Sequence, residues 1–303
     1  MISTIIPTFN DAEKAINTAK RLKEIAISSN CELEILIVDD GSSAEARKKL
    51  QSYSEFKLIL NEKNLGRAVT RNRGASLSTG ESLLFIDSDC FPVNNSFLRN
   101  HLKALKSADI SIGPVLPPPD NSFWSKYQKK SAQRRSVLFK KGYYFMMTSA
   151  NFMIKTKLFN ALRGFDPSYS RYGFEDRDFF IRAHVAGAKF SLTEDAAVIH
   201  KDNLNLTSVL RKMNEAGKTT SSIFEQRHPL VYRKLGYAAI DTRYNFLMKG
   251  IIPFFPILMH YSTILDKVLE VFPFFISNKM AKLFIAIAYA HGTFNREYAK
   301  NLQ

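Results

Sequence analysis

Two carboxylates directly follow an apolar run of the sequence. Asp87 and Asp89 come after residues 83–86, with Ser88 between them. Carboxylates at i and i+2 occupy a small volume, and their mutual repulsion is costly unless a cation lies between them. Oxygen ligands suit Mg²⁺ or Mn²⁺, which also bind diphosphate oxygens. The pair therefore indicates a divalent-metal site, although an acidic pair alone is also typical of a solvated turn.

A second acidic turn, Asp39 and Asp40, follows the apolar run 33–38. One interpretation is a turn in which Ser42 or Ser43 caps the next helix. The other is a carboxylate that hydrogen-bonds a nucleobase or a ribose. The residues alone leave both interpretations open.

A third acidic group, Glu175 and Asp176, begins a predicted helix over residues 175–185. Carboxylates favour the N-terminal end of a helix, so this pair is typical of a cap. A positioned carboxylate can also take the proton from a hydroxyl nucleophile. Asp178 is left open as a supporting residue or as the base itself. His200 ends a later apolar run, where a lone histidine is usually structural.

Alternating apolar patterns predict the elements that position these acids. Strands are expected at residues 3–7, 33–38, 57–60 and 82–86, and helices at 11–27, 43–53 and 64–78. Strands at 148–154 and 190–200 and helices from about residue 204 are expected to follow. Such alternation is typical of a doubly wound α/β sheet, in which ligands bind beyond the carboxyl ends of the strands. Both acidic turns fall at such ends.

Four motifs, in this order, resemble the nucleotide-binding half of family 2 glycosyltransferases: residues 5–10, 38–42, 64–74 and 85–89. Segments 148–154, 162–166 and 172–180 are similar to the family's acceptor half. The resemblance implies a GT-A fold, a Rossmann-like doubly wound αβα sandwich, over residues 1–202. Its nucleotide-binding half would be 1–115 and its acceptor half 116–202, with a helical C-terminal region at 203–303.

The resemblance also implies roles for matching residues. Donor-binding positions would be Pro7, Thr8, Asp39, Asp40, Arg71, Asp87 and Ser88. Asp89 and His200 would hold the metal, and Asp176 would be the catalytic base beside Glu175. Arg67 and Arg73 are left without a role.

The implied reaction is an inverting transfer of a sugar from a nucleoside-diphosphate donor to an acceptor hydroxyl, assisted by Mn²⁺ or Mg²⁺. A UDP-sugar is the first candidate donor, and a lipid-linked or surface-glycan precursor the expected acceptor. The alternatives are a catalytically inactive sugar- or nucleotide-binding relative and a sugar-nucleotide pyrophosphorylase. Residues 8–12 lack the glycine-rich basic loop that the second alternative needs.

The net charge of +15 indicates a polyanionic partner, and residues 201–303 carry 14 Lys and Arg against 7 Asp and Glu. No nucleic-acid-binding motif is present, so nucleic acid is not expected. The apolar stretches between 250 and 290, punctuated by lysines, favour a segment that lies on an anionic membrane surface. An oligomer interface is the alternative.

The basic run 126–141 is consistent with contact to phosphate or lipid, or with a solvated helix face. Residues 1–9 do not resemble a signal peptide. Cys31 and Cys90 are expected to be thiols in a reducing compartment. We therefore expect a cytoplasmic chain, peripheral at the inner face of the cell membrane.

Overall fold

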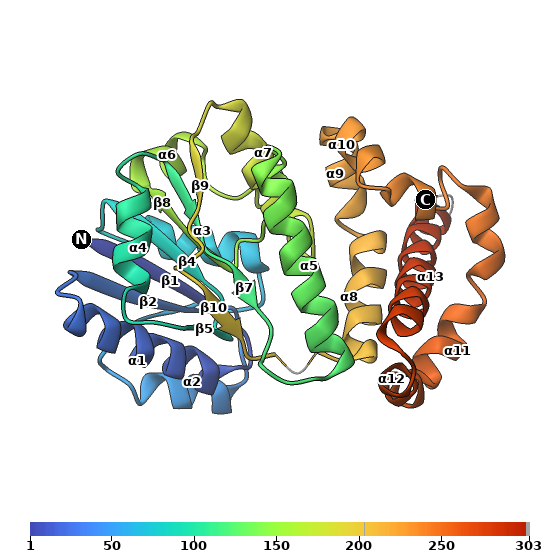
Figure 1. Cartoon of the computed structure of the whole chain (residues 1–303), viewed down its shortest axis with the longest axis horizontal. Helices are drawn as coiled ribbons and strands as arrows, with labels where there is room; N and C mark the ends of the chain where they lie inside the picture. The colour runs from blue at the N-terminus through green and yellow to red at the C-terminus, as the bar shows by residue number, and fades with distance from the viewer. Residues whose placement is uncertain (203, 301–303) are drawn as a thin grey trace. The chain divides into compact units, whose positions relative to one another are not determined.

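The computed structural model describes residues 1–202 and 204–300 (Figure 1). The chain forms two compact units. Unit 1 comprises residues 1–118, 128–170 and 175–202, and unit 2 comprises 119–127, 171–174 and the described residues after 203. The ends of the predicted C-terminal region, at 203 and 301–303, lie outside the described residues.

Unit 1 is built on a seven-stranded, mostly parallel sheet in the order β3-β2-β1-β4-β8-β6-β9. Its strands are β1 (Ile2–Thr8), β2 (Leu33–Asp39), β3 (Lys57–Leu60), β4 (Ser82–Ile86), β6 (Ile110–Ile112), β8 (Asn151–Lys155) and β9 (Phe190–Leu192). A three-stranded sheet, β5-β10-β7, joins β5 (Cys90–Pro92), β7 (Val115–Leu116) and β10 (Val198–His200). Because β1 lies between the parallel strands β2 and β4, the acidic turns after β2 and β4 share one edge of the sheet.

Helices cover both faces of the large sheet. They are α1 (Ala12–Ser28), α2 (Ala44–Gln51), α3 (Arg67–Ser76), α4 (Phe97–Ala104), α6 (Thr156–Ala161) and α7 (Glu175–Val185), with most of α5 (Phe123–Lys140) and the 3₁₀ turn η1 (Tyr144–Met146). Ile6 and Ile37 pack on the face under α1, whereas Ile5 and Phe85 pack on the opposite face with α3 and α7. This alternation along buried strands produces three layers, and the predicted αβα sandwich is confirmed.

The third helix begins later than the predicted range 64–78. α3 begins at Arg67, because Gly66 has a φ of +88° and its N–H donates to Asp40 Oδ2 at 3.0 Å. Glycine adopts this backbone conformation without strain. A Cβ at Gly66 would lie 2.3 Å from the carbonyl oxygen of Ser170, so no other residue fits. The prediction was wrong for this first turn, which is a loop.

Two predicted strands also differ from the structure. The strand predicted over 148–154 begins only at residue 151, after a turn. The strand predicted over 190–200 is two strands, β9 and β10, in different sheets. A turn separates them, in which the Ala196 N–H donates to the carbonyl oxygen of Thr193 at 2.9 Å. By contrast, Ser43 caps α2 through its side chain, one of the two capping residues that the sequence offered.

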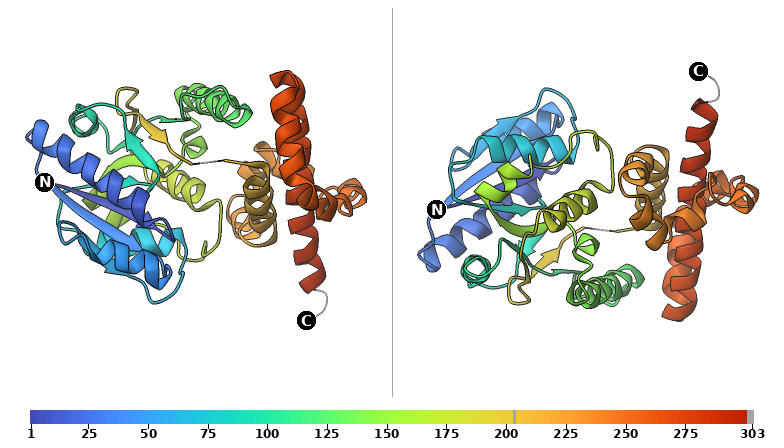
Figure 2. Two further views of the ribbon diagram at one scale, coloured as in Figure 1. Left: turned by 90° about the horizontal axis from the view of Figure 1, so that it is seen from below. Right: turned by 90° about the horizontal axis from the view of Figure 1, so that it is seen from above.

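Unit 2 is helical and has its own core. Its elements are the start of α5, α8 (Leu206–Lys218), α9 (Ser221–Arg227), α10 (Pro229–Lys234), the 3₁₀ helices η2 (Tyr237–Ile240) and η3 (Phe246–Ile251), α11 (Phe254–His260), α12 (Ser262–Val271) and α13 (Phe274–Lys300). Figure 2 shows α13 as one long helix with α8 alongside it. The two backbones approach closely at Gly217 and Gly292, where an added Cβ would meet backbone atoms of the other helix at 2.5 Å or less.

His101 on α4 is fully buried and connects two strands. Its Nε2 lies 3.2 Å from Asn151 Oδ1, and its Nδ1 lies 2.8 Å from Ser111 Oγ. Because the Asn151 amide N–H donates to the carbonyl oxygen of Ala196, Oδ1 must accept from Nε2–H, and Nδ1 accepts from the serine hydroxyl. Burial lowers the pKa of His101 to about 4, despite the hydrogen bond that its Nε2–H donates to Asn151. The side chain is therefore neutral and structural at pH 7.

We expect His101 to make the fold sensitive to acid. Below pH 6.5 the unfolded imidazole binds a proton, whereas the folded one does so only near pH 4. Stability is therefore lost as the pH falls through this window, by roughly 2.5 kcal/mol at pH 4.5. Urea unfolding at pH 7.5 and 4.5 should show this extra loss in the wild type and in His184→Gln, an exposed control. An equal loss in His101→Gln would contradict the assignment.

Candidate active site

The turn after β4 places the predicted metal-binding acid beside His200. Asp89 and His200 are both half-buried, and His200 Nε2 donates to Asp89 Oδ2 at 3.1 Å. Burial alone would raise the pKa of Asp89, but the hydrogen bond and charge of His200 outweigh it and lower that pKa. Antiparallel pairing of β10 with β5 sets His200 opposite Cys90, which brings the two segments together.

A carboxylate and an imidazole at this distance suit a shared divalent cation. Ligand atoms that are neighbours around an ion with bonds of about 2.1 Å stand roughly 3 Å apart, close to the separation seen here. Oxygen and imidazole ligands fit Mn²⁺ or Mg²⁺. The Cys90 thiol also lies within 4.8 Å of both ligand atoms, but burial raises its pKa well above the ordinary value, so it remains a neutral thiol. The donor set therefore fits the predicted metal.

The two acids after β2 have different partners. Asp40 accepts hydrogen bonds from the Leu65 and Gly66 N–H groups at 2.8 and 3.0 Å, and from the side chain of Asn61 at 3.0 Å. It therefore shapes the loop that precedes α3. Asp39 is fully buried, accepts from Arg47 Nε at 3.1 Å through Oδ2, and leaves its buried Oδ1 without a partner among the described residues.

Pro7 and Thr8 lie at the carboxyl end of β1, next to the acidic turn after β2. The carbonyl oxygen of Thr8 accepts the N–H of Asp40 at 2.8 Å, and the Thr8 hydroxyl donates to the carbonyl oxygen of Asp11. Ser88 lies between the two acids of the β4 turn, and its carbonyl oxygen accepts from the Thr18 hydroxyl at 2.8 Å. These positions thus line the same edge of the sheet as the acids.

Arg71 connects the turn after β4 to the start of α7. Its side chain is 1% exposed, and it donates to Asp87 Oδ1 at 2.7 Å and to Glu175 Oε1 at 3.5 Å. Its Nε has no partner among the described residues. Burial and the charge of Asp176 raise the pKa of Glu175, whereas Arg71 opposes that rise. The arginine thus lets two carboxylates from distant segments share one small volume.

The acids at the start of α7 divide into buried and accessible groups. Glu175 and Asp178 are buried, whereas Asp176 is half-buried and accepts the N–H of Arg177 at 2.8 Å. Asp178 accepts from Arg182 Nε at 2.8 Å, and Arg182 also donates to carbonyl oxygens of the preceding loop. Asp178 therefore supports the fold, and Asp176 is the acid of this group that is best placed to meet a substrate.

Two further basic residues act on the site: Arg67, which the sequence left without a role, and Arg135 from the basic run 126–141. Arg67, exposed at the start of α3, lowers the pKa of Asp89 and opposes the rise at Glu175, so its charge acts on both halves of the site. Arg135 on α5 is near Asp176, and burial and the charge of Arg177 lower its pKa. The sequence signal for Arg67 was its position directly after Gly66, at the start of α3.

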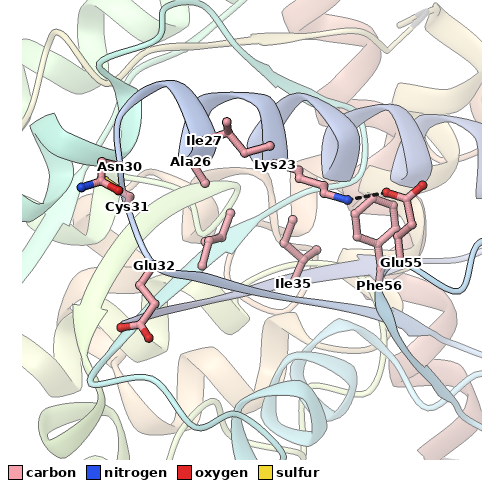
Figure 3. Close-up of a pocket in the computed structure, with 10 residues that line it drawn as sticks. Lys23, Ala26, Ile27, Asn30, Cys31, Glu32, Ile35, Glu55 and Phe56 are labelled. Carbon is pink, nitrogen blue, oxygen red and sulfur yellow. Dashed lines mark hydrogen bonds and ion pairs between the residues drawn. The ribbon is translucent and has the colours of Figure 1, made fainter.

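One surface pocket of unit 1 lies away from these acids. It has a volume of about 600 Å³ and lies between the end of α1, the start of β2 and Phe56 (Figure 3). Lys23 and Glu55 form an ion pair of 2.6 Å at one side, and the half-buried thiol of Cys31 lies at the other. Because the start of β2 is the opposite end of the strand from Asp39 and Asp40, this pocket is not part of the acidic site.

The family described as "Glycosyl transferase family 2" matches residues 3–163, more than half of the chain. The chain belongs to glycosyl transferase family 2. The sequence-based assignment to the glycosyltransferases is thereby confirmed at the level of the family. A second family, "N-terminal domain of galactosyltransferase", matches residues 128–201.

Relatives of this family 2 member come from several organisms. An uncharacterized glycosyltransferase of Bacillus subtilis, YfnE, is 27% identical over 66% of this chain and 64% of its own length. The GalNAc(5)-diNAcBac-PP-undecaprenol beta-1,3-glucosyltransferase of Campylobacter jejuni is 21% identical over 94% of this chain and 98% of its own. The chain thus covers less than two thirds of YfnE but almost all of the Campylobacter protein.

Among solved structures, the mannosyltransferase PcManGT of Pyrobaculum calidifontis, in complex with GDP-Man and Mn²⁺, has a similar fold. It is 15% identical, with a TM-score of 0.64 over 96% of this chain and 86% of its own. The likeness confirms the GT-A type of fold that the sequence predicted.

Proposed function

We propose that this family 2 member transfers a sugar from a nucleoside-diphosphate donor to an acceptor hydroxyl, with inversion at the anomeric carbon. The observation that carries the proposal is the gathering of three groups in one unit. These are the Asp89–His200 pair, the Arg71 bridge between Asp87 and Glu175, and the accessible Asp176. Arg67 links them electrostatically, since its charge acts on Asp89 and on Glu175.

The donor would bind at the carboxyl ends of β1, β2 and β4. Pro7, Thr8, Asp39 and Asp40 would line the base pocket, where the unpartnered buried Oδ1 of Asp39 is free to accept a hydrogen bond. Asp87 and Ser88 would face the ribose and the diphosphate. A UDP-sugar is the first donor to test.

Asp89 and His200 would hold Mn²⁺ or Mg²⁺, which when bound neutralises charge on the leaving diphosphate. Asp176 would accept the proton of the acceptor hydroxyl as its oxygen bonds to the anomeric carbon. Arg71 would hold the carboxylate of Glu175 in place next to Asp176. Glu175 and Asp176 would then have separate roles. Arg67 would add positive charge on the diphosphate side.

The acceptor would be a lipid-linked or surface-glycan precursor. The Campylobacter relative, whose name describes a glucosyltransferase acting on an undecaprenol-linked saccharide, supports this class because it matches the chain over nearly its whole length. Such an acceptor places the reaction next to an anionic membrane surface.

Calorimetry with UDP, dTDP, GDP and CDP tests the donor half. We expect one nucleotide to bind in the presence of Mn²⁺, with an affinity at least roughly tenfold lower without the metal or in Asp89→Ala, because the diphosphate then lacks its counter-charge. Asp195→Asn, an exposed acid outside the site, should bind like the wild type. If folded wild-type protein binds none of the four nucleotides, or if Asp89→Ala binds equally well, the proposal fails.

A further inference from the structure

Exposed apolar side chains are concentrated in one segment of unit 2. More than half of the large hydrophobic side chains that are exposed in the described part of the chain lie within residues 244–283. Phe275 is 64% exposed and Ile264 is 60% exposed. Large apolar patches of this kind mark a surface that binds a protein or a membrane.

Five of these side chains lie on three consecutive helices or at their junctions. Phe254 and Ile257 are three positions apart on α11, Tyr261 lies between α11 and α12, and Ile264 lies in the first turn of α12. α11, α12 and α13 contact one another, and Phe275 lies in the first turn of α13. An interval of three positions places Phe254 and Ile257 on the same side of α11. We call these five residues the 254–275 face.

The two acids of this segment accept hydrogen bonds within unit 2. Asp266 accepts from Trp124 Nε1 at 2.7 Å and from the Leu206 N–H at 3.0 Å. Both carboxylate oxygens of Glu270 accept the N–H of Phe123, at 2.9 and 2.8 Å. These bonds satisfy the start of α5 and the start of α8; Asp266 is half-buried, whereas Glu270 remains exposed.

The lysines of the segment are exposed. Lys267 is three positions after Ile264, and Lys279 is four positions after Phe275 with its ammonium 4.2 Å from that ring. Lys249 and Lys282 are exposed as well. Four exposed lysines thus accompany the aromatic and aliphatic side chains of the 254–275 face, against one exposed acid, Glu270, within residues 244–283.

We propose that the 254–275 face binds the surface of an anionic lipid bilayer, with its apolar side chains among the acyl chains and its lysines at the headgroups. Positive charge complements anionic headgroups, and aromatic side chains favour the interface. A second copy of the chain would bring like charges together, which disfavours that occupant. None of the helices in the described residues is long and apolar enough to span a bilayer.

Cosedimentation with vesicles tests the proposal without any nucleotide, so its result is independent of sugar transfer. Wild-type protein should bind vesicles of phosphatidylcholine with phosphatidylglycerol, bind pure phosphatidylcholine less, and be released by high salt. Lys267→Glu with Lys279→Glu should weaken binding to the anionic vesicles at least about tenfold. Ile264→Ser with Phe275→Ser should weaken binding to both kinds of vesicle.

Matched controls are available in unit 1. Val185→Ser with Ile27→Ser removes two apolar side chains that are more exposed than Ile264 and Phe275, and Lys48→Glu with Lys103→Glu reverses two exposed charges. These variants should bind vesicles like the wild type, and circular dichroism should show every variant folded. The proposal is overturned if wild-type protein stays unbound at low salt or if the controls lose binding equally. Light scattering that shows a dimer dissociated by the same two pairs of substitutions would also overturn it, in favour of a second copy.

Discussion

Asp176→Asn is expected to slow sugar transfer by about a hundred- to ten-thousand-fold while leaving donor affinity unchanged. The amide cannot take the proton of the acceptor hydroxyl, but it keeps the shape of the half-buried side chain. The measurement is the rate of nucleoside-diphosphate release from the donor that calorimetry identifies, with and without an extract of polyprenyl-linked glycans.

Substitutions of two other acids test whether Asp176→Asn acts by removing the base or only by removing a negative charge. Asp195→Asn removes an exposed carboxylate of the same unit and should retain full activity. Glu175→Gln should weaken the Arg71 ion pair, because its carboxylate contacts that arginine. If Asp176→Asn keeps wild-type turnover, another group takes the proton and the assignment of the base is wrong.

Arg71→Met is expected to cost about 3–5 kcal/mol of unfolding free energy, since it leaves the carboxylates of Asp87 and Glu175 without their shared cation. Arg71 is 1% exposed, so water cannot replace the guanidinium. Urea unfolding measures the loss directly. Arg73→Met, on the same helix but exposed and hydrogen-bonded to Leu60 and Asn61, is the matched control and should cost less than about 1 kcal/mol.

The loss of unfolding free energy caused by Arg71→Met should depend on pH. The pKa of Glu175 is already raised above 4.5 by burial and by Asp176, and removing the arginine raises it further. A carboxyl group with a raised pKa favours folding when protonated, so stability is greatest at low pH and falls as the pH rises through the folded-state pKa. The difference between wild type and Arg71→Met should therefore shrink as the pH falls from 7 toward 5. A difference that is constant with pH would show that Glu175 is not the carboxylate left unpaired.

Much of the site could be predicted because its signals are local. Each acidic turn directly follows a buried strand, and parallel strands end at one edge of a sheet, so Asp40, Asp87 and Asp89 had to lie near one another. The order of the motifs then indicated the family, and His200 as a metal ligand came from that resemblance. The start of α3 was missed because the backbone bonds from residues 65 and 66 to Asp40 are invisible to helical periodicity.

The sequence by itself thus determined the type of sheet, the edge at which ligands bind and the acids that gather there, because strand and helix periods depend on near neighbours. Only the tertiary structure decided the partners of those acids. Arg71 and Glu175 are 104 positions apart, and Asp266 meets Trp124 across 142 positions. Such pairs depend on how elements pack, and no local pattern encodes them. The same packing pairs Asp266 and Glu270 with the start of α5, and it leaves Lys267 and Lys279 exposed beside the 254–275 face.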